Sequence, residues 1–352
     1  MTKRKSRTIK IGSQPVGGDN PIVVQSMTTT DTRNVAATIA QISGLEAAGC
    51  EIIRVAVVDV EAARAIAKIK AGINIPLVAD IHFDYKLALE SVAAGTDALR
   101  INPGNIGDKG KVRQVVKACQ DHNIPIRIGV NSGSLEKKLL DKYGHVCAEA
   151  MVESALEHIK LLEDLDFKQI KISLKSSSVI LSVEAYRMMA VRVDYPLHIG
   201  ITEAGTKDRA LIKSALGMGI LLNDGIGDTV RVSLTADPLE EVWAAYEILR
   251  SLGLRNRGAE LISCPTCGRC EINLIDLAQE VDEKVRKLDK PIKVAVMGCV
   301  VNGPGEAREA DLGIAGGSGS GLLFKNGKII KKVAEKDLVK ELMKEIDNYY
   351  PD

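Results

Sequence analysis

The chain has 352 residues, of which 45% are hydrophobic and 26% are charged, a composition typical of globular proteins. Lys and Arg total 47 against 46 Asp and Glu, which gives a formal net charge of +1, and aromatic residues make up only 3%. Nucleic-acid and membrane-surface binders usually carry excess positive charge, and base stacking needs more aromatic side chains, so the sequence predicts neither kind of partner.

The first 250 residues alternate short apolar runs with longer amphipathic segments. Residues 8–18 predict a short hairpin that plugs the bottom of a barrel. Eight runs rich in Val and Ile then follow, as expected for strands buried on both faces of a parallel sheet. The predicted strands are 22–27, 51–57, 76–81, 97–102, 125–130, 169–174, 196–201 and 228–234. The predicted helices are 35–49, 60–72, 86–95, 109–123, 148–165, 183–193, 207–219 and 238–253.

Eight strands that are each followed by a helix match an α/β fold of the (β/α)8 TIM-barrel type. The alternative is a doubly wound open sheet, but no G-x-G-x-x-G motif follows the first strand. The pattern ends at a polar, Gly-containing linker at 252–263. Beyond it we expect a helix at 274–288, a strand at 292–298, a hairpin that turns on Asn326-Gly327, and a helix at 335–350. The sequence thus predicts a barrel domain over 1–257 and a small α+β domain over 258–352.

Polar side chains stand at the carboxyl ends of the predicted barrel strands, where TIM barrels place their chemistry. They are Arg54, Asp80, His82, Arg100, Asn102, Arg127, Asn131, Lys171, Lys175, His198, Glu203, Arg231 and Ser233. A single Arg in such a strand is usually part of a structural ion pair. Four arginines on four strands converge on the barrel axis and predict an anion with several oxygens, such as a phosphate or diphosphate. Asp80 with His82 is compatible with a metal pair, and equally with hydrogen bonds that hold the arginines.

A cysteine cluster follows the linker. Cys264, Cys267 and Cys270 are separated by two-residue gaps, and Cys299 follows in a Gly-flanked segment. This set suits a structural zinc site, and it also suits an iron–sulfur cluster, which the Gly- and Pro-rich surroundings favour because they expose backbone N–H groups. Glu306 lies seven residues beyond Cys299, where the loop can fold back to the same metal or expose the acid to solvent.

The remaining cysteines and a glycine-rich stretch carry less information. We expect Cys50, Cys119 and Cys147 to be small core residues. The number of cysteines, seven, is odd. No apolar run approaches the ~20 residues of a membrane span, and no apolar segment follows the basic residues 1–10, as it would in a secretory signal. We therefore expect a reducing, cytoplasmic location without a disulfide framework. Residues 315–321 suggest a phosphate cradle only weakly, because they lack the Lys and Ser/Thr of a P-loop.

Taken together, these motifs resemble those of the bacterial 4-hydroxy-3-methylbut-2-enyl diphosphate synthase family of the non-mevalonate isoprenoid pathway. The resemblance rests on VVQSMTTTDT, ADIHFD, LRINPGN, RIGVNSGSL, HIGITEAG, CPTCGRC and MGCVVNGPGEAREADLGIAGG, in this order between residues 23 and 317. It implies a [4Fe–4S] oxidoreductase that opens 2-C-methyl-D-erythritol 2,4-cyclodiphosphate and removes a hydroxyl, with two electrons from flavodoxin or ferredoxin. It also implies a homodimer.

The resemblance also implies roles for individual residues. Three cysteines and one glutamate would hold the cluster, namely Cys264, Cys267, Cys299 and Glu306. Cys270 stands where many relatives lack a cysteine, and we expect it not to be a ligand. The implied catalytic residues are Glu203, for the proton of the departing hydroxyl, and Glu306. The implied substrate contacts are Arg54, Arg100, Arg127, Asn131, Lys175, His198, Arg231, Ser233 and Asn302.

Two other hypotheses compete with this one. The first is a non-catalytic barrel that binds a phosphorylated metabolite and carries a structural zinc module. The second is a metal-dependent barrel aldolase or epimerase that uses Asp80 and His82.

Overall fold

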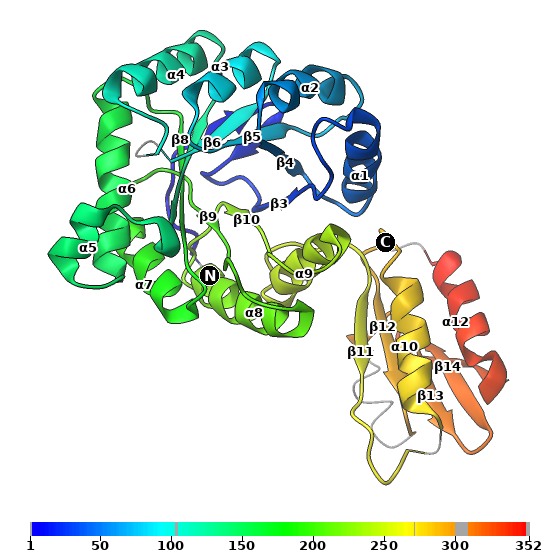
Figure 1. Ribbon diagram of the computed structural model, residues 1–352. Coiled ribbons are helices and arrows are strands. Elements are labelled where there is room, and N and C mark those ends of the chain that lie inside the picture. The colour runs from blue at the N-terminus through cyan, green and yellow to red at the C-terminus, as the bar shows by residue number, and fades with distance from the viewer. Residues whose placement is uncertain (1, 103–104, 271, 300–308, 350–352) are drawn as a thin grey trace. The chain divides into compact units, whose positions relative to one another are not determined.

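The computed structural model describes residues 2–102, 105–270, 272–299 and 309–349 (Figure 1). The chain divides into two compact units, Met1–Arg255 and Asn256–Asp352. No helix within these described ranges has both the length and the apolar character that a membrane span needs.

The first unit is a closed barrel of parallel strands. The sheet order is β8-β7-β6-β5-β4-β3-β10-β9, and a parallel bridge between Ile172 and Leu197 joins the two ends of this list. The strands are β3 (Val23–Met27), β4 (Ile52–Val57), β5 (Leu77–Ile81), β6 (Ala98–Ile101), β7 (Ile126–Asn131), β8 (Ile170–Lys175), β9 (His198–Ile199) and β10 (Thr229–Val230). The TIM-barrel prediction is therefore confirmed.

Helices surround the barrel as the sequence predicts (Figure 1). They are α1 (Val35–Ala47), α2 (Val60–Ala71), α3 (Tyr85–Ala93), α4 (Lys109–Asp121), α6 (Ala148–Glu163), α7 (Val179–Ala190), α8 (Lys207–Asn223) and α9 (Pro238–Ser251). Several begin at an acid that accepts a backbone N–H bond, including Asp59, Asp108 and Asp237. The sequence analysis missed η1 (Ser132–Ser134) and α5 (Lys137–Tyr143), because these short segments have too few turns to show a periodic apolar face.

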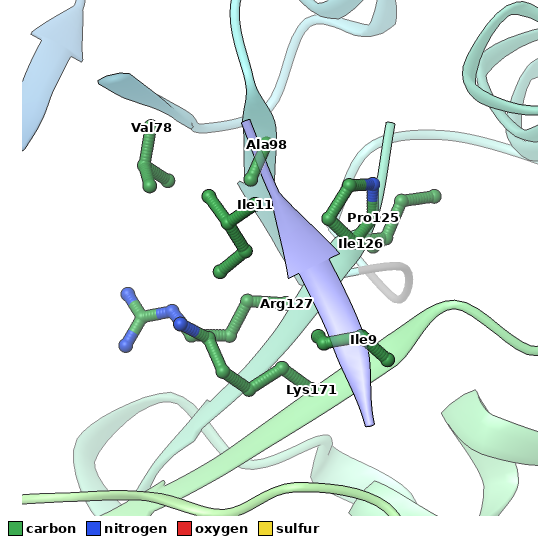
Figure 2. Close-up of a pocket in the computed structure, with 8 residues that line it drawn as sticks. All are labelled: Ile9, Ile11, Val78, Ala98, Pro125, Ile126, Arg127 and Lys171. Carbon is green, nitrogen blue, oxygen red and sulfur yellow. The ribbon is translucent and has the colours of Figure 1, made fainter. Parts of the chain in front are cut away.

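A hairpin forms the barrel floor, as predicted. Strands β1 (Ile9–Ile11) and β2 (Gln14–Val16) pair antiparallel. The side chains of Ile9, Ile11 and Val16 pack with residues at the amino ends of four barrel strands, including Val78 and Ala98. Figure 2 shows Ile11 beside these two residues, and Ile9 beside Lys171. The floor therefore closes the end of the barrel opposite the polar strand ends.

The second unit is an α+β domain with a mixed sheet of order β11-β12-β13-β14-β15. Its strands are β11 (Glu260–Ser263), β12 (Lys293–Met297), β13 (Leu312–Gly317), β14 (Ser320–Lys325) and β15 (Lys328–Ala334). Its helices are α10 (Leu274–Val285), η3 (Glu335–Asp337) and α12 (Leu338–Asp347). The hairpin turn at Asn326-Gly327 has positive φ at both residues, +47° and +73°, as the Asn-Gly signal predicts.

Two sequence predictions in this unit are wrong. The end of the expected linker, Glu260–Ser263, is strand β11, which pairs in parallel with β12. The glycine-rich stretch at 315–321 forms the β13–β14 hairpin instead of a loop that cradles phosphate. Its glycines make room for packing, because a Cβ on Gly316 would lie 2.3 Å from the side chain of Ile272.

Candidate functional site

Basic side chains gather inside the mouth of the barrel. Parallel pairing aligns Arg100 with Arg127, and Asn131 with Lys175, at neighbouring strand ends. Because side chains alternate between the two faces of a strand, these positions point toward the barrel axis. The exposed fractions are 9% for Arg54, 7% for Arg100, 3% for Arg127 and 6% for Lys175.

These residues line a cavity of about 180 Å³. Its lining consists of Arg54, Asp80, His82, Arg100, Arg127, Asn131, Ser173, Lys175, Thr202, Arg231 and Ser233. The set holds five arginines and lysines but one carboxylate, so the wall is strongly biased toward positive charge. A small cavity with this bias suits a compact ligand that carries several negative charges.

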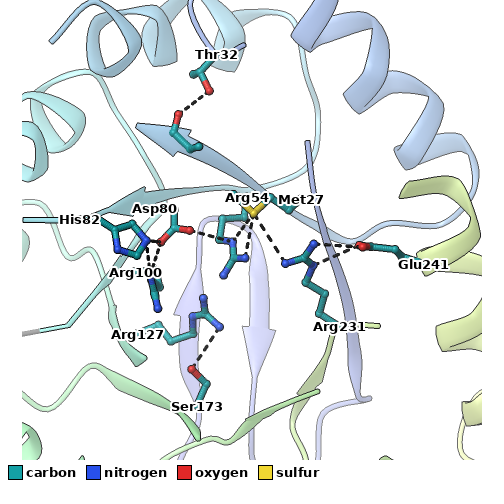
Figure 3. A network of polar contacts seen from close by, with 11 residues as sticks. Met27, Thr32, Arg54, Asp80, His82, Arg100, Arg127, Ser173, Arg231 and Glu241 are labelled. Carbon is teal, nitrogen blue, oxygen red and sulfur yellow. Dashed lines mark hydrogen bonds and ion pairs between the residues drawn. The ribbon is translucent and has the colours of Figure 1, made fainter. Parts of the chain in front are cut away.

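Asp80 is the carboxylate that holds the cations together (Figure 3). Its Oδ1 lies 3.1 Å from Arg100 Nη1, and its Oδ2 lies 3.6 Å from Arg54 Nε. Burial by itself would raise the pKa of Asp80, but Arg54, a hydrogen bond with His82, Arg100 and Arg127 together lower it. His82 Nε2 lies 2.6 Å from Arg100 Nη1 and 3.5 Å from Asp80 Oδ1, so the imidazole contacts both members of this ion pair. The geometry favours the hypothesis that Asp80 and His82 position arginines over the metal-pair hypothesis.

Arg231 is held by a helix outside the sheet. Its Nε and Nη2 donate to the carboxylate of Glu241 on α9 at 3.3 and 3.2 Å. Between Arg231 and Arg54 lies the sulfur of Met27, which accepts from Arg54 Nε and Nη2 at 3.1 and 3.0 Å (Figure 3). A thioether is a weak hydrogen-bond acceptor. An oxyanion that enters the mouth can therefore take over the N–H groups of Arg54 from the Met27 sulfur at little cost.

Burial and mutual repulsion act on the basic groups. Burial lowers the pKa of Arg54 to about 10, with Asp80 opposing this shift and Arg231 and Arg100 adding to it. Burial, followed by repulsion from Arg127, also lowers the pKa of Lys175 well below its ordinary value. Clustered cations of this kind are unfavourable without an anion between them, so the site is electrostatically prepared for one.

Of the thirteen polar residues predicted at the strand ends, nine line this cavity, whereas Asn102, Lys171, His198 and Glu203 do not. His198 is fully buried and does not line it; its Nδ1 lies 2.7 Å from Thr229 Oγ1. Burial, followed by Lys175 and Arg127, lowers the pKa of His198 well below its ordinary value. Glu203 is exposed just beyond β9, with φ +51°, a strained conformation that residues at functional sites often adopt.

The sequence analysis missed three residues of this region. Ser173 lines the cavity and accepts from Arg127 Nη1 at 3.4 Å. Ser173 lies between Lys171 and Lys175 on β8, and side chains two residues apart on a strand point to the same face. This alternation could have identified Ser173 from the sequence. Thr202 lines the cavity from the loop after β9, and Glu241 acts from α9; no sequence motif marks either residue.

The cysteines of the second unit come together because β11 and β12 run parallel. Cys264 directly follows β11 and Cys299 follows β12 by two residues, so both stand at the same sheet edge. The backbone N–H of Gly298 donates to Cys264 Sγ at 3.2 Å, which holds this sulfur beside the end of β12. The Cys270 N–H bonds the Cys267 carbonyl at 3.0 Å and closes a tight turn.

Cys270 points back into the same site. Its Sγ donates to the carbonyl of Ile272 at 3.2 Å, and a Cβ on Gly298 would lie 2.7 Å from this sulfur. Cys267 is exposed, whereas Cys264, Cys270 and Cys299 are partly buried. Among the described residues, no three or more His, Cys, Asp or Glu side chains stand together in a way that could hold a metal ion. The predicted residues Asn302 and Glu306 lie outside the described residues.

The residue types fit a cluster bound by thiolates, since Cys264 and Cys299 follow two neighbouring parallel strands and the Gly298 N–H reaches the Cys264 sulfur. The other cysteines lie on the barrel. Cys50 and Cys119 are buried in its core, and burial raises the pKa of each thiol to about 12, which keeps both protonated. Cys147 packs partly buried against the same core.

Comparison with solved structures agrees with the fold of the first unit. A dihydropteroate synthase from Stenotrophomonas maltophilia aligns with a TM-score of 0.52 and 13% identity, over 70% of this chain and 97% of that chain. The 7,8-dihydropteroate synthase from Vibrio fischeri also gives 0.52, with 14% identity over 70% and 99% of the two chains. At this identity the likeness concerns the barrel fold alone.

Comparison with protein families and curated sequences covers nearly the whole chain. The model of the GcpE TIM-barrel domain matches residues 6–246, and that of the GcpE protein C-terminal domain matches 260–348. A 4-hydroxy-3-methylbut-2-en-1-yl diphosphate synthase (flavodoxin) from Geobacter sulfurreducens is 61% identical over 98% of each chain. The enzyme of that name from Clostridium acetobutylicum is 60% identical over 99% of this chain and 100% of the relative. With both of its units matched and its cation-lined mouth and cysteine site in place, this chain belongs to the GcpE family.

Proposed function

We propose that this protein is a 4-hydroxy-3-methylbut-2-en-1-yl diphosphate synthase of the non-mevalonate isoprenoid pathway, and that flavodoxin supplies its electrons. The reaction takes 2-C-methyl-D-erythritol 2,4-cyclodiphosphate, two electrons and two protons to the linear diphosphate and one water. The identity of about 60% to synthases over nearly the full chain supports this proposal. The observation that carries it is a cation-lined barrel mouth on the same chain as a cysteine site.

The barrel mouth binds the diphosphate in this proposal. Arg54, Arg100, Arg127 and Arg231 offer N–H groups in planar forks that match phosphate oxygens. Lys175, Asn131 and Ser233 add donors from the neighbouring strand ends. His198 acts from beneath the cavity wall, where it keeps the lining in place. Asn302, which lies outside the described residues, contacts the substrate as well.

Cys264, Cys267, Cys299 and Glu306 hold a [4Fe–4S] cluster in this proposal. Such a cluster supplies electrons one at a time, and a carboxylate at one iron makes that position exchangeable. The N–H of Gly298 stabilises the negative charge of Cys264 as a ligand. Cys270 stays a thiol that donates to the Ile272 carbonyl.

Glu203 handles the proton of the departing hydroxyl. Its position just beyond β9, exposed and in a strained backbone conformation, gives a carboxyl that solvent can recharge with a proton. The proposal further includes a homodimer in the cytoplasm, where the cysteine ligands remain reduced. Sedimentation of the anaerobic protein at two concentrations tests the dimer.

Anaerobic purification tests the whole assignment. The protein should be brown, should contain iron and sulfide in equal amounts, and should convert the cyclic diphosphate with reduced flavodoxin. A colourless, air-stable protein with stoichiometric zinc and no iron would instead support the metabolite-binding barrel with a zinc module. Activity that persists in Cys299→Ser would support the metal-dependent aldolase or epimerase.

A matched pair of variants tests the ligand assignment. Cys267→Ser should lose iron, whereas Cys270→Ser should keep iron and the visible absorption of the cluster. Both substitutions replace one sulfur by oxygen within the same short segment, so general damage to the domain affects them alike. Equal loss of iron from both variants would show that Cys270 is a ligand.

A further inference from the structure

Lys171 is a buried amine that the proposed reaction does not use. It lies on β8 two residues before Ser173 and four before Lys175, so the three side chains share one face of the strand. Lys171 lies below the cavity and is 2% exposed. Within the described part of the chain, no hydrogen-bond acceptor is in reach of its Nζ. Figure 2 shows its side chain beside Arg127 and the floor residues Ile9 and Ile11, around a void too small to hold a water molecule.

The groups that face Lys171 are mostly basic. Arg127 is its register partner on β7, Arg54 acts from β4, Lys175 shares its strand, and His198 acts from β9. The opposing carboxylate, Asp228, lies before β10.

Asp228 is already compensated by other groups. It pairs with Lys3 and Arg4 of the N-terminal arm at 3.6 and 3.7 Å, and it accepts from Ser6 Oγ and the Leu197 N–H, both at 2.8 Å. Little of its charge is left to balance an ammonium at Lys171. Burial, followed by repulsion from Arg127 and Arg54, therefore holds the pKa of Lys171 well below its ordinary value.

A bound polyanion reverses the preference of the Lys171 side chain for its neutral form. Arg127 lines the cavity above and the void below, so an anion that contacts Arg127 lies within one side-chain layer of Lys171. At that range several negative charges outweigh the repulsion from the neighbouring cations. The ammonium form of Lys171 then becomes the favourable one.

We propose that Lys171 is the proton-uptake site of the barrel: its amine is neutral without ligand and takes one proton from solvent when a diphosphate-type polyanion binds. The lone pair of Nζ accepts the proton, and no bond of the anion breaks. This inference rests on the proposed function for the identity of the anion. It adds that anion and proton enter together, so that affinity for the anion falls as the pH rises.

Isothermal titration calorimetry of the anaerobic holoprotein tests this coupling. The probe is 2-C-methyl-D-erythritol 2,4-cyclodiphosphate without reductant, so that no turnover occurs; its phosphates carry no titrating proton near neutral pH. Binding heats in buffers with different ionisation enthalpies give the number of protons taken up. We expect up to about one proton per bound anion, since a single amine titrates. Absence of binding would overturn the proposed function and this inference with it, whereas binding without proton uptake would overturn this inference alone.

Two substitutions assign the proton to Lys171. Lys171→Met places an apolar chain of similar length beside Ile9 and Ile11, so it should fold. It should abolish the uptake and weaken binding roughly tenfold through the lost charge. Lys171→Arg keeps a permanent charge, so it should abolish the uptake while retaining tight binding. The exposed Lys168, which pairs with Asp166, gives the control Lys168→Met, which should behave as wild type.

The arginine variant also excludes the neighbouring basic groups. Lys171→Arg reproduces the charged state of the complex and Lys171→Met reproduces the uncharged state of the free protein, so Lys175 and His198 keep their bound-state surroundings in one variant and their free-state surroundings in the other. Proton uptake that persists in Lys171→Arg would place the proton on one of those groups and overturn the inference. If that variant does not fold, uptake that persists in Lys171→Met overturns it equally.

Discussion

Replacing Asp80 by Asn removes the buried negative charge on which the basic mouth depends. The attraction of Asp80 to Arg100 at 3.1 Å and to Arg54 at 3.6 Å is about 5 kcal/mol each at an effective dielectric constant of ~20, before desolvation. Desolvation consumes most of that gain, and the measured cost of breaking a buried ion pair is about 3–5 kcal/mol. We therefore expect Asp80→Asn to lose about 3 kcal/mol of barrel stability, which is a large part of the ~5–15 kcal/mol of a typical domain.

Urea unfolding of the full-length protein measures this loss. The single tryptophan, Trp243, lies on α9, so its fluorescence reports on the barrel. For an m-value of ~3 kcal/mol/M, the midpoint should fall by about 1 M. The control is Asp194→Asn, which removes the carboxylate of an exposed pair with Arg7 and should cost at most about 1 kcal/mol. Addition of the cyclic diphosphate should restore part of the stability of Asp80→Asn, since the anion replaces the missing charge.

The pH dependence sharpens this prediction. The cationic neighbours of Asp80 more than offset the effect of its burial, so its pKa lies below the unfolded value of ~3.9. The stabilisation by the carboxylate is therefore complete above about pH 4 and is lost as the pH falls through the folded pKa. The difference between wild type and Asp80→Asn should be constant from about pH 5 to pH 8. A loss no larger than that of Asp194→Asn would refute the electrostatic account of the mouth.

Two further predictions concern the supports of the site. Gly200→Ala should cost about 2 kcal/mol and weaken binding of the anion in calorimetry, because the new Cβ would lie 2.3 Å from the Arg231 carbonyl oxygen; unchanged stability would contradict this contact. Burial alone raises the pKa of Glu136, but hydrogen bonds from His158 and others lower it to about 2, so its stabilisation holds above ~pH 4.3 and fades below. Glu136→Gln should therefore lower the urea midpoint at pH 7, and its deficit against wild type should shrink as the pH falls below about 4 and vanish only below about pH 2. An equal deficit at pH 7 and at about pH 3 would be inconsistent with the ion pair.

The barrel was predictable from sequence because its strands are buried on both faces and therefore consist of short runs of Val and Ile. The two-residue strands β9 and β10 are much shorter than the predicted runs at 196–201 and 228–234. Beyond these strands the two segments approach closely, because a Cβ on Gly200 would lie 2.3 Å from the Arg231 carbonyl oxygen. Such a close approach depends on tertiary packing and leaves no periodic signal in the sequence.

The candidate site was predictable to the extent that its residues belong to strands. Arg54, Arg100 and Arg127 lie at strand ends, so topology alone brings them to one mouth. Partners from outside the sheet, such as Glu241 on α9, were missed because helix–strand contacts follow from packing. The same limit applies to β13, where Gly316, one of the glycines that suggested a phosphate loop, leaves room for the side chain of Ile272.

The barrel floor also has a consequence for the order of folding. The arm before the hairpin leaves the ribosome first, yet Arg4 donates to the carbonyls of Val193 and Tyr195, and Ser6 donates to Asp228. These contacts join residues 189, 191 and 222 positions apart, so they form only after almost the entire barrel has been synthesised. Contacts of such long range slow folding. The arm is thus made before the barrel strands, but it can dock through Arg4 and Ser6 only after residues 193–228 have followed it.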